Sequence, residues 1–340
     1  MKIGVELRRF KLKALLPKTH GLLQRGYSIL SNRKQRKLRK RQIFNVIEAI
    51  PFLFVASIAR ILPRTTALRL GGMLGRVSRF VQPGRSKTAL ENLRHAYPEQ
   101  TETWIKLQVV RVFEHLGVSG IEMLRLDKFT SEQDLDTYFT FEGLEHLEEI
   151  QRQNKGAFIL SGHIGFWEVG TFFMPMLGFP VDFVAKKVHN PVVHRFFERQ
   201  REAAGGHCIE SKHGARKILR SLAEKRMVCL LLDQHLSKDQ AILADFFGRP
   251  AYTTPIIAQI ALKTGVPVVP VFVYRKPGFT YHVEIGAPQY FEGKATAENI
   301  QKHTQQMTSI TEEAIRKQPA QWFWVHHRWR RVRDSQTNAQ

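Results

Sequence analysis

The architecture of this chain follows from the segment Ala157–Phe158–Ile159–Leu160–Ser161–Gly162–His163–Ile164–Gly165–Phe166–Trp167–Glu168. The apolar run at 157–160 predicts a buried strand. Gly162 and Gly165 then allow a tight bend, and a helix is expected at 166–175. The segment therefore predicts a strand, a turn and a helix in succession, with His163 presented in the turn.

His163 and Glu168 form an H-x-x-x-x-E pair at this junction. An imidazole is a base near neutral pH, and a carboxylate can hold its other ring nitrogen in the useful tautomer. Residues five apart on an ideal helix differ by about 140°, so the side chains meet only if His163 lies in the turn and Glu168 on the helical turns beyond it. The pair predicts an enzyme that deprotonates a hydroxyl. The alternative is a solvated or core histidine that precedes a glutamate by chance.

The predicted secondary structure of the remaining chain changes near residue 155, from helices alone to alternating strands and helices. Before it, residues 63–150 carry apolar side chains at helical spacing, with helices expected at Leu68–Phe80, Lys87–Tyr97 and Thr101–Leu126. After it, predicted strands are Ala157–Ser161, Val181–Lys186, Val228–Asp233, Ala241–Phe246, Val268–Tyr274 and Tyr281–Ile285. Predicted helices between and after them are Phe166–Pro175, Pro191–Ala204, Ala215–Glu224, Pro255–Lys263 and Ala297–Lys317. This alternation predicts an α/β fold with a central mixed sheet flanked by helices.

Polar side chains follow two of these strands. Sites in open α/β sheets usually lie beyond the carboxyl ends of the strands. His163 and Asp233 both fall at such ends, and Asp233 closes the apolar run 228–232. Its carboxylate is expected to emerge at the edge of the sheet. The alternative is a turn or helix cap, a role that aspartate fills well.

The formal net charge of +22 indicates an anionic partner. Residues 1–42 hold fourteen Lys and Arg against one acid, so +13 of this charge lies there. Such a run is a nucleic-acid arm, a membrane-surface patch or a solvated tail. The twenty mostly apolar residues Ile43–Leu62 favour the membrane, because that length can cross a bilayer as a helix. Glu48, Pro51 and Arg60 leave an interfacial helix open as the alternative.

The sequence is thus divided into a basic segment at 1–42, a membrane-associated or transmembrane helix at 43–62 and a single further domain at 63–335. A polybasic run beside an apolar helix fits anionic headgroups on the cytoplasmic side of a membrane. No signal peptide is expected, since the basic lead is long and no clean cleavage site follows it. Cys208 and Cys229 are too few for a disulfide framework, which suits a reducing compartment.

Several motifs in combination resemble one family. They are the His163 segment, Asn190–Pro191, Asp233–Gln234, Phe246–Phe247–Gly248–Arg249–Pro250–Ala251–Tyr252–Thr253–Thr254–Pro255 and Gln321–Trp322–Phe323–Trp324–Val325–His326–His327–Arg328–Trp329. From about residue 43 to about residue 333, in this order, the chain resembles the late acyltransferases of lipid A biosynthesis, of the lauroyl and myristoyl type. These are related to the glycerolipid acyltransferases. The resemblance implies a glycerolipid-acyltransferase-like fold and transfer of a fatty acyl group from acyl carrier protein to a hydroxyl of a membrane lipid.

The resemblance also implies roles for residues. His163 and Glu168 match the family's H-x4-D/E motif, so His163 is the expected general base and Glu168 the residue that orients its ring. Backbone N–H groups near Gly162–Gly165 are candidates for stabilising the oxyanion. Asp233 belongs to the polar cluster of the substrate site. No covalent acyl-enzyme is expected, and the G-x-S-x-G elbow of the α/β-hydrolases is absent from the sequence.

Three arginines are candidates for binding phosphate on the substrate. Arginine recognises phosphate with a planar fork of donors. Arg199 and Arg201 lie on the predicted helix after Asn190. The resemblance implies an arginine in this neighbourhood for lipid phosphate or for the phosphopantetheine arm of the carrier; the sequence leaves both open, and Arg201 is the preferred candidate. Arg249 lies in the 246–255 motif. The alternative for each is a solvated surface residue.

The C-terminal block at 322–333 mixes three tryptophans with six basic side chains. Such a block fits a membrane interface, single-stranded nucleic acid, or tryptophans that pack the last segment onto the domain. His326 and His327 lack a carboxylate partner at ligand spacing, so neither a metal nor a cofactor is expected.

The sequence therefore predicts a membrane-associated O-acyltransferase on the cytoplasmic face of a bacterial inner membrane. Its expected partners are acyl carrier protein as donor and a lipid A precursor as acceptor. Carrier proteins of this type are acidic, so a basic face on the enzyme would speed their association with it. The first alternative is the same chemistry on another lysophospholipid or glycolipid. The distant alternative is a basic nucleic-acid-binding protein, although no known nucleic-acid module is recognisable and nucleic acid is not an expected partner.

Overall fold

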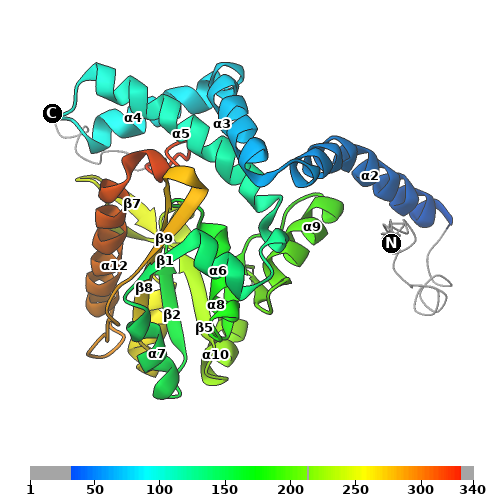
Figure 1. Ribbon diagram of the computed structural model, residues 1–340. Helices are drawn as coiled ribbons and strands as arrows, with labels where there is room; N and C mark the ends of the chain where they lie inside the picture. The colour runs from blue at the N-terminus through cyan, green and yellow to red at the C-terminus, as the bar shows by residue number, and fades with distance from the viewer. Residues whose placement is uncertain (1–31, 213, 331–340) are drawn as a thin grey trace, which may run out of the picture. The chain divides into compact units, whose positions relative to one another are not determined.

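The computed structural model describes residues 32–212 and 214–330 (Figure 1). Most of the basic segment at 1–42, the last arginines of the C-terminal block and the domain end expected at 335 lie outside these residues. The chain separates into two compact units, which divide between Ile50 and Pro51. That boundary falls inside helix α2 (Asn32–Ile61).

Helix α2 contains the apolar segment singled out in the sequence. Within the described residues, Arg39–Ile61 is long and apolar enough to cross a membrane. By length and composition alone, it is therefore a candidate membrane span.

The last turns of α2 are part of the core of the second unit. Ala56 and Ala59 are buried in a small cluster with Leu124. Arg60 forms a two-pronged ion pair with Asp127, and its Nη2 lies 2.9 Å from Oδ2. The charge of Arg60, which weakens the spanning interpretation at this end of the helix, is thus neutralised within the second unit.

A seven-stranded mixed sheet forms the centre of the second unit, with strand order β1-β9-β8-β2-β5-β3-β4 (Figure 1). Neighbouring strands are parallel except β8 and β9, which are antiparallel. The strands are β1 (Phe139–Glu142), β2 (Ala157–Ser161), β3 (Val181–Ala185), β4 (His207–Glu210), β5 (Met227–Leu231), β8 (Val268–Lys276) and β9 (Thr280–Ile285). The predicted α/β fold with a central mixed sheet is confirmed.

A separate antiparallel hairpin is formed by β6 (Ile242–Asp245) and β7 (Pro250–Thr253). Its turn residues Phe247 and Gly248 both have positive φ, 56° and 72°. Two successive residues of this kind are typical of a type I′ turn, which matches the twist of a two-stranded ribbon. The 246–255 motif thus contains the turn and the second strand of this hairpin.

Helices surround the sheet and extend beyond it. They are α3 (Arg64–Val81), α4 (Pro83–Ala96), α5 (Glu102–Met123), α6 (Glu132–Tyr138), α7 (Leu144–Arg152), α8 (Gly170–Met176), α9 (Pro191–Glu202), α10 (Ala215–Ala223), α11 (Ile256–Thr264) and α12 (Ala297–Lys317). Short 3-10 helices lie at η3 (Leu126–Lys128), η4 (Trp167–Val169), η5 (Lys238–Gln240), η6 (Pro277–Phe279) and η7 (Pro319–Gln321). The helix predicted at 166–175 is therefore two elements, η4 followed by α8.

Strand β2 lies between the two main parts of the core. Its side chains alternate: Ala157 and Ile159 pack into a cluster that includes α7 and α8, whereas Phe158 and Leu160 pack into one that includes α10, α11 and α12. All five residues of the strand are buried. A strand that is covered on both faces has a continuous apolar sequence, and this pattern allowed β2 to be predicted.

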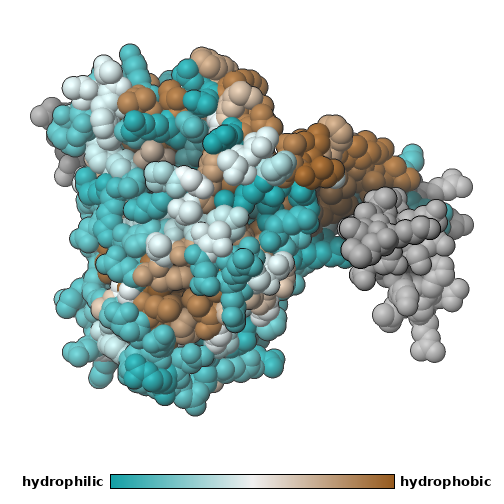
Figure 2. All heavy atoms as spheres, viewed as in Figure 1, coloured by the Kyte–Doolittle hydropathy of each residue, from teal (hydrophilic) through white to brown (hydrophobic). Residues whose placement is uncertain are grey.

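Helices α3 and α5 pack through glycines. A Cβ atom at Gly117 of α5 would lie 2.1 Å from the carbonyl oxygen of Gly71 and 2.7 Å from the Cα of Gly75. The backbones touch, so the small residues of α3 face inward. The opposite face of α3 carries large apolar side chains that remain exposed, and Figure 2 shows hydrophobic residues gathered over this helix.

We predict that Gly117→Ala destabilises the second unit by about 1–3 kcal/mol, because the new methyl group meets backbone atoms that cannot rotate away. Gly120→Ala is the matched control on the same helix, since nothing lies within 4 Å of its Cβ position. It should be neutral or stabilising by up to about 1 kcal/mol. Denaturant unfolding in detergent measures both, and equal effects of the two changes would contradict this packing.

Candidate active site

The turn after β2 is held by contacts from three directions. Gly165 has φ of +57°, and a Cβ there would lie 1.8 Å from the carbonyl oxygen of Val273. Its N–H donates to the Gln321 carbonyl at 2.9 Å, and Ile164 forms an isolated bridge with Trp322. Only glycine fits at this point, so the turn presents His163 in one fixed place.

The carboxylate of Asp233 holds His163 twice. One oxygen accepts from the His163 backbone N–H at 2.8 Å, and the other lies 2.9 Å from ring Nδ1. The indole N–H of Trp322 donates to the first oxygen at 2.6 Å. Burial raises the pKa of the Asp233 carboxyl, but the charge of His163 and these hydrogen bonds outweigh it and lower the pKa to about 2. Asp233 is therefore an ionised, fully engaged partner of the histidine.

Glu168 does not orient the ring of His163, contrary to the expectation from the sequence. Its carboxylate forms a fork with Arg201, at 2.7 Å to Nε and 2.8 Å to Nη2. Both side chains are only 12–13% exposed. Burial lowers the pKa of Arg201, but the bond to Glu168 outweighs this and leaves it raised. Nδ1, the nitrogen that Glu168 was expected to hold, is occupied by Asp233, which lies 70 residues away in the sequence.

Gln234 is a contact of His163 to which the sequence assigned no role. Its side-chain amide nitrogen lies 3.0 Å from ring Nε2. Gln234 follows Asp233 in one of the family motifs, but its contact with His163 depends on how the loop after β5 lies against the turn after β2. Trp167 and Phe323 flank the ring, with centroids 5.0 and 6.0 Å away. The ring thus has one nitrogen bound to Asp233, the other facing Gln234, and apolar walls.

Three of the predicted backbone donors of the turn are already engaged. His163 N donates to Asp233, Ile164 N donates to the Gly162 carbonyl at 2.7 Å, and Gly165 N donates to Gln321. The regular helix also begins only at Gly170. These three amides therefore do not form an oxyanion hole in this arrangement, and the expectation for them is corrected.

The C-terminal block packs onto the site. Of the three interpretations given for it, the structure agrees with tryptophans that pack the last segment onto the domain. Trp322 and Trp324 are buried in the core. Arg328 is completely buried and donates to the carbonyls of Gln234 and Tyr252, at 3.1 and 2.6 Å. His326 accepts from the backbone N–H of His235 at 2.8 Å, and burial lowers the pKa of its ring to about 4. This block fixes the loop that carries Asp233 and Gln234.

The other two arginines are not brought into these contacts. Arg199 is exposed on α9, so of the two candidate arginines on that helix it is Arg201 that reaches Glu168. Arg249 is exposed in the β6–β7 hairpin, where its charge, second to burial, lowers the pKa of His95. Neither guanidinium is among the groups that contact His163, Asp233 or Glu168 in the described part of the chain.

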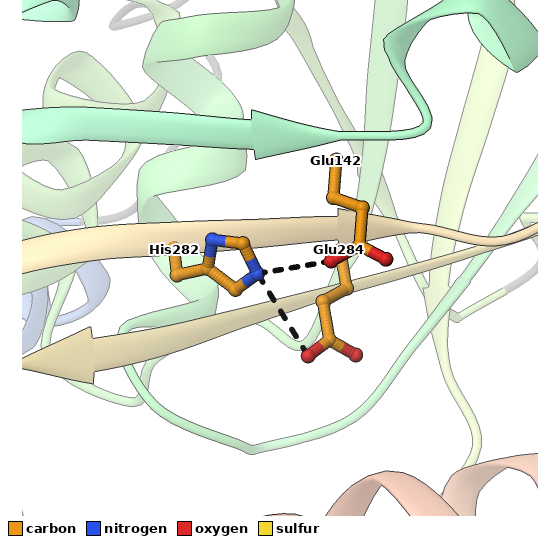
Figure 3. Close-up of side chains that lie close together, drawn as sticks. All are labelled: Glu142, His282 and Glu284. Carbon is orange, nitrogen blue, oxygen red and sulfur yellow. Dashed lines mark ion pairs between the residues drawn. The ribbon is translucent and has the colours of Figure 1, made fainter.

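A second cluster lies on the sheet edge. Glu142 of β1 is the register partner of Glu284 of β9, and the ring of His282 points toward both carboxylates (Figure 3). The His282 Nε2 atom is 3.3 Å from Glu142 and 3.9 Å from Glu284, and ligand atoms of all three lie within 4.8 Å of one another. Glu284 also pairs with Lys317. Strands β1 and β9 supply none of the contacts of His163 given above, so this is a separate surface charge cluster.

Comparison with known proteins gives consistent relatives. The family model for bacterial lipid A biosynthesis acyltransferases matches residues 33–331. The lipid A biosynthesis palmitoleoyltransferase of Escherichia coli is 23% identical over 274 residues, covering 79% of this chain and 86% of that protein. The phosphatidylinositol mannoside acyltransferase of Mycobacterium tuberculosis is 24% identical over 194 residues, covering 55% of this chain and 58% of that protein.

Among solved structures, the 1-acyl-sn-glycerophosphate acyltransferase PlsC from Thermotoga maritima matches with a TM-score of 0.35 and 15% identity, over 73% of this chain and 98% of that one. The family indicated by the sequence motifs is confirmed by the family model, which spans most of the chain. This chain belongs to the bacterial lipid A biosynthesis acyltransferases.

Proposed function

We propose that this protein moves a fatty acyl chain from the thioester of acyl carrier protein to a hydroxyl of a lipid A precursor, with His163 as general base. The family supports acyl transfer in lipid A biosynthesis. The observation that supports the mechanism is the bond between Asp233 and Nδ1 of His163, which leaves Nε2 as the nitrogen that we propose to be reactive. The side chain of His163 is 21% exposed, so a substrate can reach it.

The proposed reaction has two proton transfers. Nδ1–H donates to Asp233, so Nε2 keeps its lone pair and takes the proton of the acceptor hydroxyl. The hydroxyl oxygen attacks the thioester carbonyl carbon. When the tetrahedral intermediate collapses, the carbon–sulfur bond breaks and Nε2–H protonates the departing thiolate. The ionised carboxylate of Asp233 stabilises the imidazolium between these steps.

Gln234 is proposed to supply the oxyanion contact. Its amide nitrogen lies 3.0 Å from Nε2, in the place that the acceptor hydroxyl must take. Substrate binding therefore displaces the carboxamide, whose N–H groups then face the neighbouring thioester carbonyl. A neutral donor beside the developing negative charge lowers the barrier, and the amides of His163, Ile164 and Gly165 are already engaged.

Glu168 and Arg201 are proposed as positioning residues. The pair joins η4 to α9 and fixes the segment that follows His163. Because the Nε and Nη2 donors of Arg201 are held by Glu168, phosphate binding by the same fork would require breaking a largely buried ion pair. We therefore assign Arg201 to the support of the turn, and Asp233 to His163 instead of to substrate.

The acceptor and the location are also proposals. Relatives named for lipid A biosynthesis support a lipid A precursor. The relative named for phosphatidylinositol mannoside favours another glycolipid as the second candidate acceptor. The candidate span in α2 and the basic segment before it support binding to the inner membrane on its cytoplasmic face, where the carrier protein is found.

We predict that purified full-length protein transfers acyl chains from acyl carrier protein to a lipid A precursor, and that His163→Ala lowers the rate by at least about 100-fold. Mass spectrometry of the lipid product measures the transfer, and circular dichroism verifies the fold of the variant. Transfer to a glycolipid or lysophospholipid in place of the lipid A precursor would select the alternative acceptor. Near-normal transfer by folded His163→Ala would reject the mechanism for every acceptor.

We further predict different outcomes for the two carboxylates. Asp233→Asn should lower kcat by about 10²–10⁴-fold, because an amide nitrogen facing Nδ1 favours the tautomer with its proton on Nε2. Glu168→Gln keeps one bond to Arg201 and should lower kcat by about tenfold or less. Steady-state kinetics at saturating substrate separates the two. Comparable losses in both folded variants would restore Glu168 as the partner of His163.

A further inference from the structure

Helix α3 has two apolar faces, and only one of them is covered. The inner face, with Gly71 and Gly75, packs against α5. The outer face carries six large apolar side chains that are 39–77% exposed. They are Leu70, Met73, Leu74, Val77, Phe80 and Val81. Their spacing of three and four residues places them in one stripe along the helix, and an exposed stripe of this size marks a binding surface.

A groove continues the stripe at the end of α3. It has a volume of about 550 Å³ and lies between the end of α3, the start of α4 and α5. Phe80, Leu90 and Leu107 give it apolar walls. Apolar surface thus runs from the face of α3 into a groove large enough for part of a lipid molecule.

Three cations line the same groove. They are Arg79, Lys87 and Lys106, and no acidic residue is among the lining residues. The guanidinium of Arg79 lies over the ring of Phe80, 4.0 Å from its centroid. Lys87 is 3.8 Å from Glu91, but both side chains are well exposed, and such a pair is weak. The groove therefore joins positive charge to apolar surface, which is the chemistry of an anionic phospholipid.

The position of α3 in the chain favours a membrane over a soluble partner. Helix α2, the candidate membrane span, ends at Ile61, and α3 begins at Arg64. Six large apolar side chains are unfavourable in water whenever a transient partner leaves, whereas a bilayer covers them permanently. We propose that the outer face of α3 lies in the membrane interface and that the groove binds an anionic phospholipid, with its phosphate between Arg79, Lys87 and Lys106.

This site is distinct from acyl transfer and does not depend on that proposal. It adds a second membrane contact to the one expected from residues 1–62. It also ties the catalytic domain itself to the bilayer surface, because α3 packs on α5. The domain is then bound to the bilayer through one of its own helices as well as through the candidate span.

The first test uses full-length protein in vesicles with a fluorescent probe on a single cysteine. In a Cys208→Ala, Cys229→Ala background, probes at Leu74→Cys and Val77→Cys should be quenched by nitroxide-labelled lipids. Leu219→Cys on α10 is the control, because Leu219 is a similarly exposed leucine on another helix, 43% against 58% for Leu74. Quenching at 74 and 77 no stronger than at 219 would overturn the proposal.

The second test addresses the groove. Native mass spectrometry of full-length protein with phosphatidylglycerol and phosphatidylcholine should show preferential retention of phosphatidylglycerol. Lys87→Glu with Lys106→Glu should reduce that retention by about tenfold or more, whereas Lys263→Glu on α11 should not. Unchanged retention would overturn the groove assignment. If the paired change instead weakens binding of acyl carrier protein while the α3 probes stay unquenched, the surface serves the carrier and the proposal fails.

Discussion

The candidate active site depends on one buried carboxylate. Asp233 lies two residues after the end of β5 and accepts hydrogen bonds from the backbone and ring of His163 and from the indole of Trp322. It thereby joins the turn after β2, the central sheet and the C-terminal block. A buried carboxylate is stable only when its oxygens are satisfied, so these three segments must come together for the domain to fold with Asp233 ionised.

The surrounding strands and side chains bring Asp233 and His163 together. Strands β2 and β5 are parallel neighbours, and their carboxyl ends place His163 and Asp233 at the same edge of the sheet. Gln321 links the turn to β8 through its backbone carbonyl, which accepts from Gly165, and through its side chain, which bonds both backbone groups of Arg275. The buried Arg328 holds the loop after β5 from the other side. Residues far apart in the sequence therefore fix one histidine, whose Nε2 nitrogen faces Gln234.

The fold could be predicted from the sequence more accurately than the contacts within the candidate site. Strand β2 and helix α12 have the bounds expected from it, because a buried strand and a long periodic helix give strong local signals. The strands β1, β4 and β7 have four residues each, too few for a recognisable alternation. In the site, His163 and Asp233 were both identified, but their pairing depends on strand order, which no local pattern reveals. Glu168 was assigned to the histidine because it is near in sequence, whereas its partner Arg201 comes from another helix.

The central claim, that Asp233 fixes the tautomer of His163, is tested most directly by nitrogen NMR of the full-length protein in detergent with ¹⁵N-labelled histidine. The signal of His163 is the one absent from the His163→Gln variant. At a pH where the ring is neutral, the account predicts a protonated Nδ1 and an unprotonated Nε2, lost in Asp233→Asn and kept in Glu168→Gln. A proton on Nε2 in the unmodified protein, or a tautomer that changes with Glu168→Gln and not with Asp233→Asn, would contradict it.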